Sequence, residues 1–480
     1  MMFVPLTTDI LVWLLFAAIA AYFVYVLRQP HLLMPWRRVT QSAYGMSALV
    51  VLAAFIVVGL LDSLHYRPVL ERKAGQDAAY STEVLSVFDA VATGLRARRE
   101  RTYSAPFATR AYARETIEIS GPGGKPRQAR EFPRLSWGGA HLKDEAERDN
   151  DIFVRAAQGL MLGLLAWCAL AAAVTLLHAR LANRTAREAW RAIWRTETRT
   201  PWHAILFTAG ALLAFAGLAF ALCTHYHILG TDKVGRDVFY LALKSIRTGL
   251  VIGTLTTLVL LPFAVTLGIM AGYFRGWIDD AIQYIYTTIS SIPGVLLIAA
   301  AVLLMQVYID RHPEIFPTAA ERADLRLLFL CVILGLTSWT GLARLLRGEA
   351  LKLRELEFVQ AAQAFGVRDA RIISRHILPN VMHIVLITLV MDFSGLVLAE
   401  AVLSYVGVGV DPSMISFGTM INAARLEMSR EPIVWWALAA AFVFMFVLVL
   451  AANLFADAVR DAFDPRVRAG YAPRLANAKA

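Results

Sequence analysis

The chain is poor in cysteine and in charged residues, and it carries no recognisable set of catalytic side chains. Its 480 residues include three cysteines, and charged residues make up 18%. Cys168, Cys223 and Cys331 all fall in apolar segments without the spacing of metal ligands, so we expect packing residues and no disulfide framework. His225 and His227 lack a third metal ligand nearby. With no nucleophile triad and no paired catalytic carboxylates, the sequence predicts a protein that is not an enzyme and binds no metal or cofactor directly.

Apolar residues, by contrast, are abundant. They make up 58% of the chain, which is too many for one soluble core of this length. A helix of about 20 apolar residues crosses a hydrocarbon layer of ~30 Å. The sequence predicts an all-α integral membrane protein, with a proline-induced kink at Pro293. Nine spans are expected near residues 10–27, 43–61, 153–178, 204–224, 246–272, 278–305, 327–346, 384–408 and 433–457.

Positive charge is concentrated in three segments between the predicted spans. Short loops rich in arginine and lysine stay on the cytoplasmic side. Nine spans place the three segments on that one side, with the N-terminus outside and the C-terminus inside, and the first span is interpreted as an uncleaved anchor. The net charge of +10 is therefore attributed to these loops and not to nucleic-acid binding. The basic residues are Arg28, Arg37 and Arg38; Arg180, Arg184, Arg187, Arg191, Arg195 and Arg199; and Arg344, Arg347, Lys352, Arg354, Arg368, Arg371 and Arg375.

The largest stretch outside the predicted spans is 62–152, which this orientation places on the extracytoplasmic side. A helical pattern at 79–100 and a strand-like pattern at 113–120 predict a small α+β insert. The pair Gly124 and Lys125 is not a phosphate-binding loop, because the upstream glycine spacing is missing and a proline follows. The insert either braces the protein, contacts a partner or is a passive appendage.

A polar, helix-prone segment at 347–380 separates the seventh and eighth predicted spans. Gly366 is expected to end one short helix in the left-handed conformation, and Pro379 to stop a second helix before the next span. Ala361 and Ala362 are small enough for a partner to approach the helix backbone closely. The pattern indicates a docking surface, and an amphipathic surface helix without a partner is the alternative.

This segment resembles the cytoplasmic coupling loop, or EAA loop, of the membrane subunits of ABC importers. That loop reads Glu-Ala-Ala, three residues, Gly, nine residues, Ile-x-Leu-Pro. Gln360 stands at the acidic position and keeps its length but not its charge, and His376 stands at the isoleucine position. The spacing is kept at Ala361, Ala362, Gly366, Leu378 and Pro379.

Four further segments are similar to one subfamily of these subunits, in the same order along the chain. Residues 227–237 read His-Ile-Leu-Gly-Thr-Asp-Lys-Val-Gly-Arg-Asp and resemble the subfamily's Pro-Leu-Gly-Thr-Asp-x-x-Gly-Arg-Asp pattern. The others are 271–279, 399–418 and 457–466. Together with the loop they identify residues 201–470 as similar to the C-type subunit of dipeptide/oligopeptide permeases.

The resemblance implies an ABC type I importer bundle of six spans in residues 201–470. It would follow an accessory region, 1–200, of about three extra spans and the insert 62–152. The implied setting is the bacterial cytoplasmic (inner) membrane. Implied partners are a second, B-type permease subunit, two ABC ATPase subunits carrying ATP and Mg, and an extracytoplasmic solute-binding protein. The implied function is import of di- or oligopeptides, with alternating access driven through the loop.

Three groups of candidate site residues follow. Contacts to the ATPase are expected from Arg354, Glu357, Gln360, Ala361, Ala362, Gly366, Leu378 and Pro379. An outer gate, or a docking floor for the binding protein, is expected from Gly230, Thr231, Asp232, Gly235, Arg236 and Asp237. The alternative for that group is a rigid turn fixed by a local ion-pair cluster of Asp232, Arg236 and Asp237.

Asp392 and Glu400 lie in the eighth predicted span. An ionisable residue there either faces the translocation path or reaches protein or water near the end of the span. The same two carboxylates would serve an ion-coupled secondary transporter, which is the main alternative function, followed by a non-transporting membrane scaffold. The identity of the substrate is not encoded in these patterns.

Overall fold

The computed structural model describes residues 2–69, 80–120, 126–312 and 318–463, and these form two compact units. Of the described residues, one unit holds 2–3, 49–69, 80–120, 126–248 and 415–448, and the other holds 4–48, 249–312, 318–414 and 449–463. Within the described residues, nine helices or helix runs are long and apolar enough to cross a membrane, which confirms the predicted number. They are Thr7–Arg28, Ala43–Asp62, Glu145–Leu181, Trp202–Cys223, Val238–Phe274, Gly294–Arg311, Ala319–Arg354, Asp369–Val406 and Trp436–Phe463.

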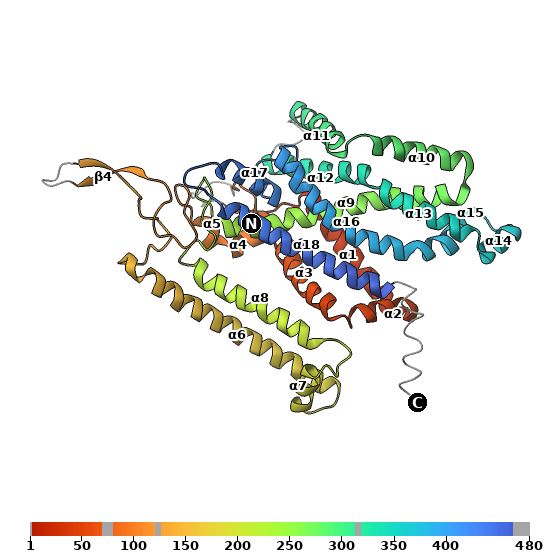
Figure 1. Ribbon diagram of the computed structural model, residues 1–480, viewed down its shortest axis with the longest axis horizontal. Coiled ribbons are helices and arrows are strands. Elements are labelled where there is room, and N and C mark those ends of the chain that lie inside the picture. The colour runs from red at the N-terminus through yellow and green to blue at the C-terminus, as the bar shows by residue number, and fades with distance from the viewer. Residues whose placement is uncertain (1, 70–79, 121–125, 313–317, 464–480) are drawn as a thin grey trace, which may run out of the picture. The chain divides into compact units, whose positions relative to one another are not determined.

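The insert is a small α+β arrangement in the first unit, as predicted. Strand β2 (His65–Arg67) pairs antiparallel with both β1 (Met2–Phe3) and β3 (Leu85–Ser86), and β4 (Glu115–Ser120) forms a hairpin with β5 (Pro126–Glu131) (Figure 1). The helical pattern at 79–100 corresponds to two short helices, α4 (Val87–Val91) and α5 (Thr93–Ala97). The side chain of Ser86 accepts a hydrogen bond from the Asp89 N–H in a capping box, which explains why α4 begins there.

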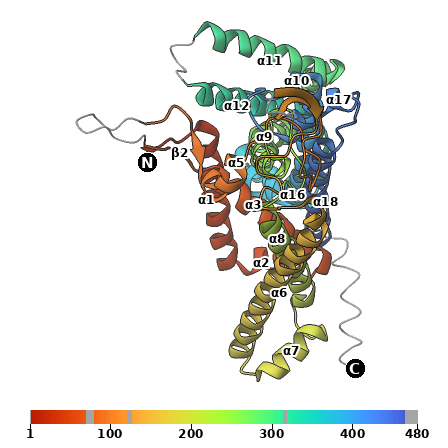
Figure 2. The same ribbon diagram turned by 90° about the vertical axis from the view of Figure 1, so that its left-hand side faces the viewer.

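Two long helices of the first unit form a hairpin, and a third, short helix connects them. Helices α6 (Arg148–Leu181) and α8 (Trp202–Cys223) run side by side, and α7 (Ala186–Trp194) lies at the end where they are joined (Figures 1 and 2). A Cβ atom at Gly159 would lie 2.6 Å from the carbonyl oxygen of Gly217, so small residues allow the two backbones to approach closely. The first unit also contains α17 (Phe417–Glu427), the end of α3 (Ala43–Asp62) and the starts of α9 (Val238–Phe274) and α18 (Trp436–Phe463).

The second unit begins with α1 (Thr7–Arg28) and α2 (Pro30–Val39) and contains most of the helices around the 347–380 segment. The buried Asp324 carboxylate of α12 (Ala319–Ser338) accepts hydrogen bonds from the Thr7 hydroxyl at 2.6 Å and the Thr8 N–H at 3.0 Å. Asp324 therefore fixes the first turn of α1 on α12.

The sixth predicted span, 278–305, is two helices and not one kinked helix. Helix α10 (Gly276–Ser291) ends before Ile292, whose backbone is extended at φ −88° and ψ 131°, and α11 (Gly294–Arg311) starts after Pro293. A proline disfavours helical backbone in the residue before it and removes a helical N–H donor, so the helix breaks completely here. Among the described residues of this region, only α11 meets the length and apolarity of a span.

Pro379 does not stop a helix, which corrects the second proline prediction. Helix α15 (Asp369–Ile372) continues through a π-helical turn (Ile373–Ile377) into α16 (Leu378–Val406). Pro379 is the second residue of α16, which directly follows the π-helical turn, and the widened backbone of that turn accommodates a proline without ending the helix. The run Asp369–Val406 is one continuous, locally widened helix.

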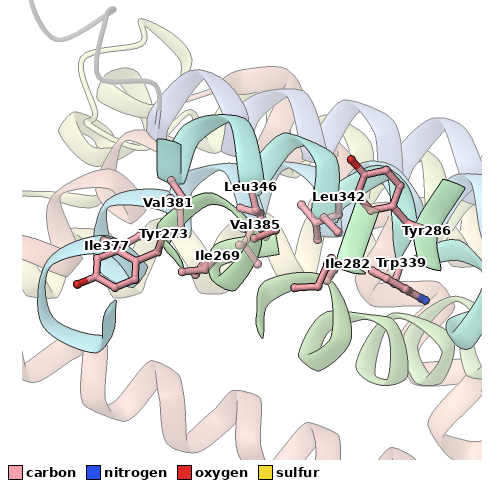
Figure 3. Packing of buried hydrophobic residues seen from close by; sticks show 14 of the residues in the cluster. Ile269, Tyr273, Ile282, Tyr286, Trp339, Leu342, Leu346, Ile377, Val381 and Val385 are labelled. Carbon is pink, nitrogen blue, oxygen red and sulfur yellow. The ribbon is translucent and has the colours of Figure 1, made fainter. Parts of the chain in front are cut away.

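The apolar core of the second unit joins α9, α10, α13 (Thr340–Arg354) and α16. Figure 3 shows side chains of Ile269, Leu342, Leu346, Val381 and Val385 gathered between these helices. The same buried cluster extends to Val359, Ile372 and Ile377 of the 347–380 segment. The segment is therefore packed onto the helices that it connects.

Candidate functional site

The 347–380 segment, called here the predicted coupling loop, turns at Gly366. Helix α14 (Glu357–Ala364) ends in a Schellman motif: the Gly366 N–H donates to the Gln363 carbonyl at 2.9 Å, and the Val367 N–H donates to the Ala362 carbonyl at 3.1 Å. Gly366 has φ +72°, as predicted. Among the described residues, no atom outside Gly366 and its two chain neighbours lies within 4 Å of the position of its missing Cβ, so the backbone conformation, and not crowding, favours glycine here.

One face of this turn is anchored to the core of the second unit. Val359 of α14 and Ile372 of α15 are fully buried, and Ala362 and Val367 pack partly against the same cluster. The two short helices on either side of Gly366 are thus held by their apolar residues.

Tyr273, at the end of α9, joins three parts of the loop. Its hydroxyl donates to Asp369 Oδ1 at 2.6 Å and accepts from the Gln363 side-chain amide at 3.2 Å. Its carbonyl accepts from the Arg354 guanidinium at 2.8 Å. Through these bonds, one residue fixes the end of α13, helix α14 and the start of α15.

A second polar contact ties α13 to α10. Arg347 forms a bidentate ion pair with Asp279, with Nε to Oδ1 at 2.6 Å and Nη2 to Oδ2 at 2.7 Å. Paired planar groups of this kind define orientation as well as distance. Nearby, Arg275 and Glu355 form a further ion pair.

The opposite face of the loop is exposed. Glu357, Gln360 and Ala361 are all exposed, and Phe365 beside the turn is 86% exposed. The side-chain amide of Gln360 donates a hydrogen bond of 3.2 Å to the Glu355 carbonyl. An ionised glutamate at this position could not donate that bond. The exposed face combines a small residue with a prominent aromatic ring.

The other predicted coupling residues have different surroundings. Arg354 is half-buried and bound to Tyr273, so its guanidinium serves the loop's own structure. Leu378 is half-buried against the core and Pro379 is exposed. Sequence reasoning missed Phe365 and Tyr273, although both lie inside the segments that carried the resemblance.

The 227–237 segment lies in the first unit and forms a tight turn. Asp232 Oδ1 accepts from the N–H groups of Val234 and Arg236, and Asp232 Oδ2 accepts from Arg236 Nε at 2.8 Å. Asp232 and Arg236 therefore form the predicted ion pair. Asp237 does not take part in it, because its Oδ1 accepts from the N–H groups of Phe239 and Tyr240 and caps the start of α9.

This segment is packed against the insert. The Thr231 hydroxyl accepts from the Ser104 N–H at 2.7 Å, and the Trp436 indole donates to the Thr231 carbonyl at 2.9 Å. Gly235 has φ +74°, and a Cβ atom there would lie 1.8 Å from the Glu100 carbonyl oxygen. Gly230 has φ +67° and is similarly confined against Ser104. Residues 100–104 of the insert thus cover one side of the segment.

A buried ion-pair cluster fixes the same contact, and sequence reasoning missed it. His227 Nδ1 lies 2.7 Å from Asp237 Oδ2, and His227 Nε2 lies 3.4 Å from Glu100 Oε1. Burial lowers the pKa of His227, but the two carboxylates outweigh it and raise the pKa to about 9. Burial raises the pKa of Glu100, but His227 and the N–H groups of residues 136–138 lower it to about 2. The imidazolium is therefore held between two carboxylates.

The two carboxylates of α16 differ in burial. Glu400 is 1% exposed and its Oε1 accepts a hydrogen bond of 2.7 Å from the Ser404 hydroxyl, one turn further on. Asp392 lies two turns earlier and is half-buried. Both remain candidates for the translocation path.

The apolar helices define a multi-pass membrane protein, and the predicted coupling loop between two of its candidate spans is structured and packed onto the core. Residues 264–469 match the family described as binding-protein-dependent transport system inner membrane component. This match contains the entire predicted coupling loop, as well as Tyr273, Asp392 and Glu400.

Curated relatives point the same way. A glutathione transport system permease protein of Pectobacterium atrosepticum is 30% identical over 310 residues, which cover 60% of this chain and 94% of that protein. The oligopeptide transport system permease protein of Mycobacterium bovis is 31% identical over 242 residues, which cover 50% of this chain and 77% of that protein. The dipeptide transport system permease protein of Bacillus subtilis is 29% identical, covering 50% and 69%. This chain belongs to the family of permease subunits of ABC importers and is a multi-pass inner membrane protein.

Among solved structures, the MetNI methionine ABC transporter in an inward-facing conformation is similar over 47% of this chain and 97% of the compared chain. The sequence identity is 15% and the TM-score is 0.34.

Proposed function

We propose that this permease subunit imports di- or oligopeptides and that the predicted coupling loop transmits the closure of an ATPase partner to the membrane helices. ATP and Mg would be bound by two ATPase subunits, and this chain would be non-catalytic. A second permease subunit and an extracytoplasmic solute-binding protein would complete the importer. Support for peptides comes from the relatives, which are named for glutathione, oligopeptide and dipeptide transport.

The observation that carries the coupling proposal is the two-faced loop. Its inner face is fixed by buried residues and by Tyr273, while its outer face presents Ala361 and Phe365. A push on the outer face would therefore reach α9, α13 and α16 through packed contacts and would not be absorbed by a soft hinge. A loop that transmits a movement from a partner to the membrane helices requires such rigid contacts.

The remaining assignments extend the same proposal. Residues 201–470 would form the transport bundle, with the N-terminus outside and the C-terminus in the cytoplasm. Residues 1–200 would be an accessory region, whose insert braces the 227–237 segment. Because that segment is already covered on one side by the insert, a binding protein would dock on the combined surface, with Lys233 and Val234 exposed at the turn.

Photocrosslinking tests the docking step directly. A benzophenone amino acid at Phe365 should crosslink an ATPase in membranes, whereas the same group at Trp137, which is 48% exposed in the insert, should not. Two results would overturn the proposal: no ATPase product from position 365, or uptake by the purified complex that is driven by an ion gradient without nucleotide. The second result would favour the secondary-transporter alternative.

A further inference from the structure

An apolar cavity lies at the end of the α6–α8 hairpin, beside α7. Its volume is about 330 Å³, within the range of small-molecule sites. Val174 and Trp202 line it and also pack against a buried cluster of Ala171, Ile193 and Leu206, which joins all three helices. The cavity is therefore part of a fixed helical corner. Its lining residues are Val174, Leu177, His178, Leu181, Ala182 and Trp202.

Six arginines lie in residues 178–200, the segment that joins α6 through α7 to α8. All six are exposed, and none forms an ion pair or a side-chain hydrogen bond with any residue in the described parts of the chain. Residues 178–200 hold only two acidic residues, and one of them, Glu188, is engaged in the capping box that starts α7 with Thr185. The segment 178–200 therefore carries a clear excess of positive charge. The arginines are Arg180, Arg184, Arg187, Arg191, Arg195 and Arg199.

Helix α7 has the side-chain order of a helix that lies at a membrane surface. Ile193 is fully buried against α6 and α8. Trp190 and Trp194, one turn apart, are each 40% exposed, with ring centroids 5.5 Å apart. By helical spacing, Arg187 and Arg191, also one turn apart, share the side of α7 that lies next to the two tryptophans and away from Ile193. Core, aromatic and basic faces thus follow one another around the helix, and tryptophan and arginine of this kind favour the headgroup layer.

We propose that this corner binds an anionic phospholipid. The phosphate would lie against the arginines of α7, and one acyl chain would enter the cavity between α6 and α8. An anionic lipid fits both features, because it carries charge of the opposite sign next to an apolar chain. A soluble anion would leave the cavity empty, and a neutral lipid would leave the arginines unpaired.

The proposal goes beyond the transport function and does not depend on it. Residues 1–263 lie outside the matched family segment, so the site concerns a part of the chain that the family match does not cover. Bound lipid would hold the hairpin at the membrane surface and fix its depth.

Native mass spectrometry of the full-length chain, with any subunits that co-purify, tests the proposal. The protein is first equilibrated in bilayers of equal dioleoylphosphatidylglycerol and dioleoylphosphatidylcholine. Retained phosphatidylglycerol should exceed phosphatidylcholine in the unaltered chain. The triple variant R187Q/R191Q/R195Q should bind phosphatidylglycerol on the order of 100-fold more weakly. Each of the three arginines is expected to contribute a similar share of the binding free energy. A triple variant at Arg28, Arg37 and Arg38 controls for loss of charge elsewhere.

A matched pair on α6 tests the cavity. Leu177→Trp fills it and should reduce phosphatidylglycerol retention roughly tenfold, through lost burial of a few methylene groups. Leu176→Trp should leave retention unchanged, because Leu176 is equally exposed at 54% against 58% but does not line the cavity.

Three outcomes would overturn the proposal. The first is equal retention of the two lipids by the unaltered chain. The second is equal loss in the two arginine triples, which would mean general surface charge. The third is equal retention by the two tryptophan variants, which would mean that no acyl chain enters the cavity. Both tryptophan variants change exposed positions, so we expect them to fold normally. Size-exclusion chromatography in detergent checks this, because both should elute at the volume of the unaltered chain.

Discussion

Replacing Gly366 is the sharpest test of the predicted coupling loop. The residue has φ +72°, and a Cβ placed there would have no atom within 4 Å from any described residue other than Gly366 and its two chain neighbours. A substitution therefore costs free energy through the backbone and not through a clash. A residue with a Cβ pays about 1–2 kcal/mol for the left-handed conformation, and a β-branched residue is disfavoured further.

For Gly366→Val we estimate a cost of about 2 kcal/mol, or roughly a 30-fold smaller population of chains that keep the turn. The alternative backbone would also lose the two hydrogen bonds of the Schellman motif, from Gly366 to Gln363 and from Val367 to Ala362. Gly366→Asn is the matched control, because asparagine adopts the left-handed conformation readily and equally finds open space.

The readouts are the amount of ATPase that co-purifies per permease subunit, the rate of peptide uptake, and the amount of chain in the membrane. The valine variant should lose most co-purified ATPase and uptake at normal membrane levels, while the asparagine variant should keep both. If valine and asparagine behave alike, the left-handed turn does not matter for docking and the reasoning is wrong. If the valine variant fails to enter the membrane, the residue acts in folding and not in coupling.

Three further predictions concern contacts within one unit each. Tyr273→Phe removes the hydroxyl that donates to Asp369, at a local cost of about 1–2 kcal/mol, so hydrogen exchange in 357–372 should be roughly tenfold faster while membrane levels stay normal. Gly235→Ala places a Cβ 1.8 Å from a backbone carbonyl of the insert and should lower the melting temperature, whereas Gly366→Ala, with open space, should lower it far less. The ion pairs of His227 with Asp237 and Glu100 should make the free energy of unfolding depend on pH. Its pKa rises from 6.5 to about 9, so about 3 kcal/mol of stabilisation is full below pH 6.5 and lost as the pH rises through 9. The pKa of Glu100 falls from 4.5 to about 2, so its contribution is present above pH 4.5 and lost toward pH 2, and melting curves of the unaltered chain and of His227→Gln should converge above pH 9.

The sequence was sufficient for features that depend on neighbours along the chain. Long apolar runs predicted nine spans, and alternation near 113–120 predicted the strand that became β4. The glycine at 366 was correctly expected to end a helix, because helix termination is a local event. The two proline predictions failed for a related reason. The effect of a proline depends on the backbone before it, and neither the extended Ile292 nor the π-helical turn before Pro379 could be placed from the sequence.

Contacts between distant residues were out of reach. Asp237 has Arg236 next to it in sequence, so a local ion pair was expected, but the fold brings His227 to its carboxylate and Glu100 from the insert to the same imidazole. Tyr273 likewise lies 96 residues before its partner Asp369. No periodicity or spacing encodes such pairs, because burial of the polar atoms is decided by which helices and loops pack together.

The packing of the loop bears on the proposed docking, because the EAA motif is altered here at its acidic position. The acidic residue of the EAA pattern is replaced by Gln360, whose amide is taken up by the Glu355 carbonyl. The direction of Phe365 is set by the turn at Gly366 and by the anchoring of Val359 on the core, and neither depends on the lost charge. A binding surface that is already ordered loses less conformational entropy when a partner arrives. The affinity of the loop for an ATPase should then follow the shape of the turn, so Gln360→Glu should change docking much less than Phe365→Ala.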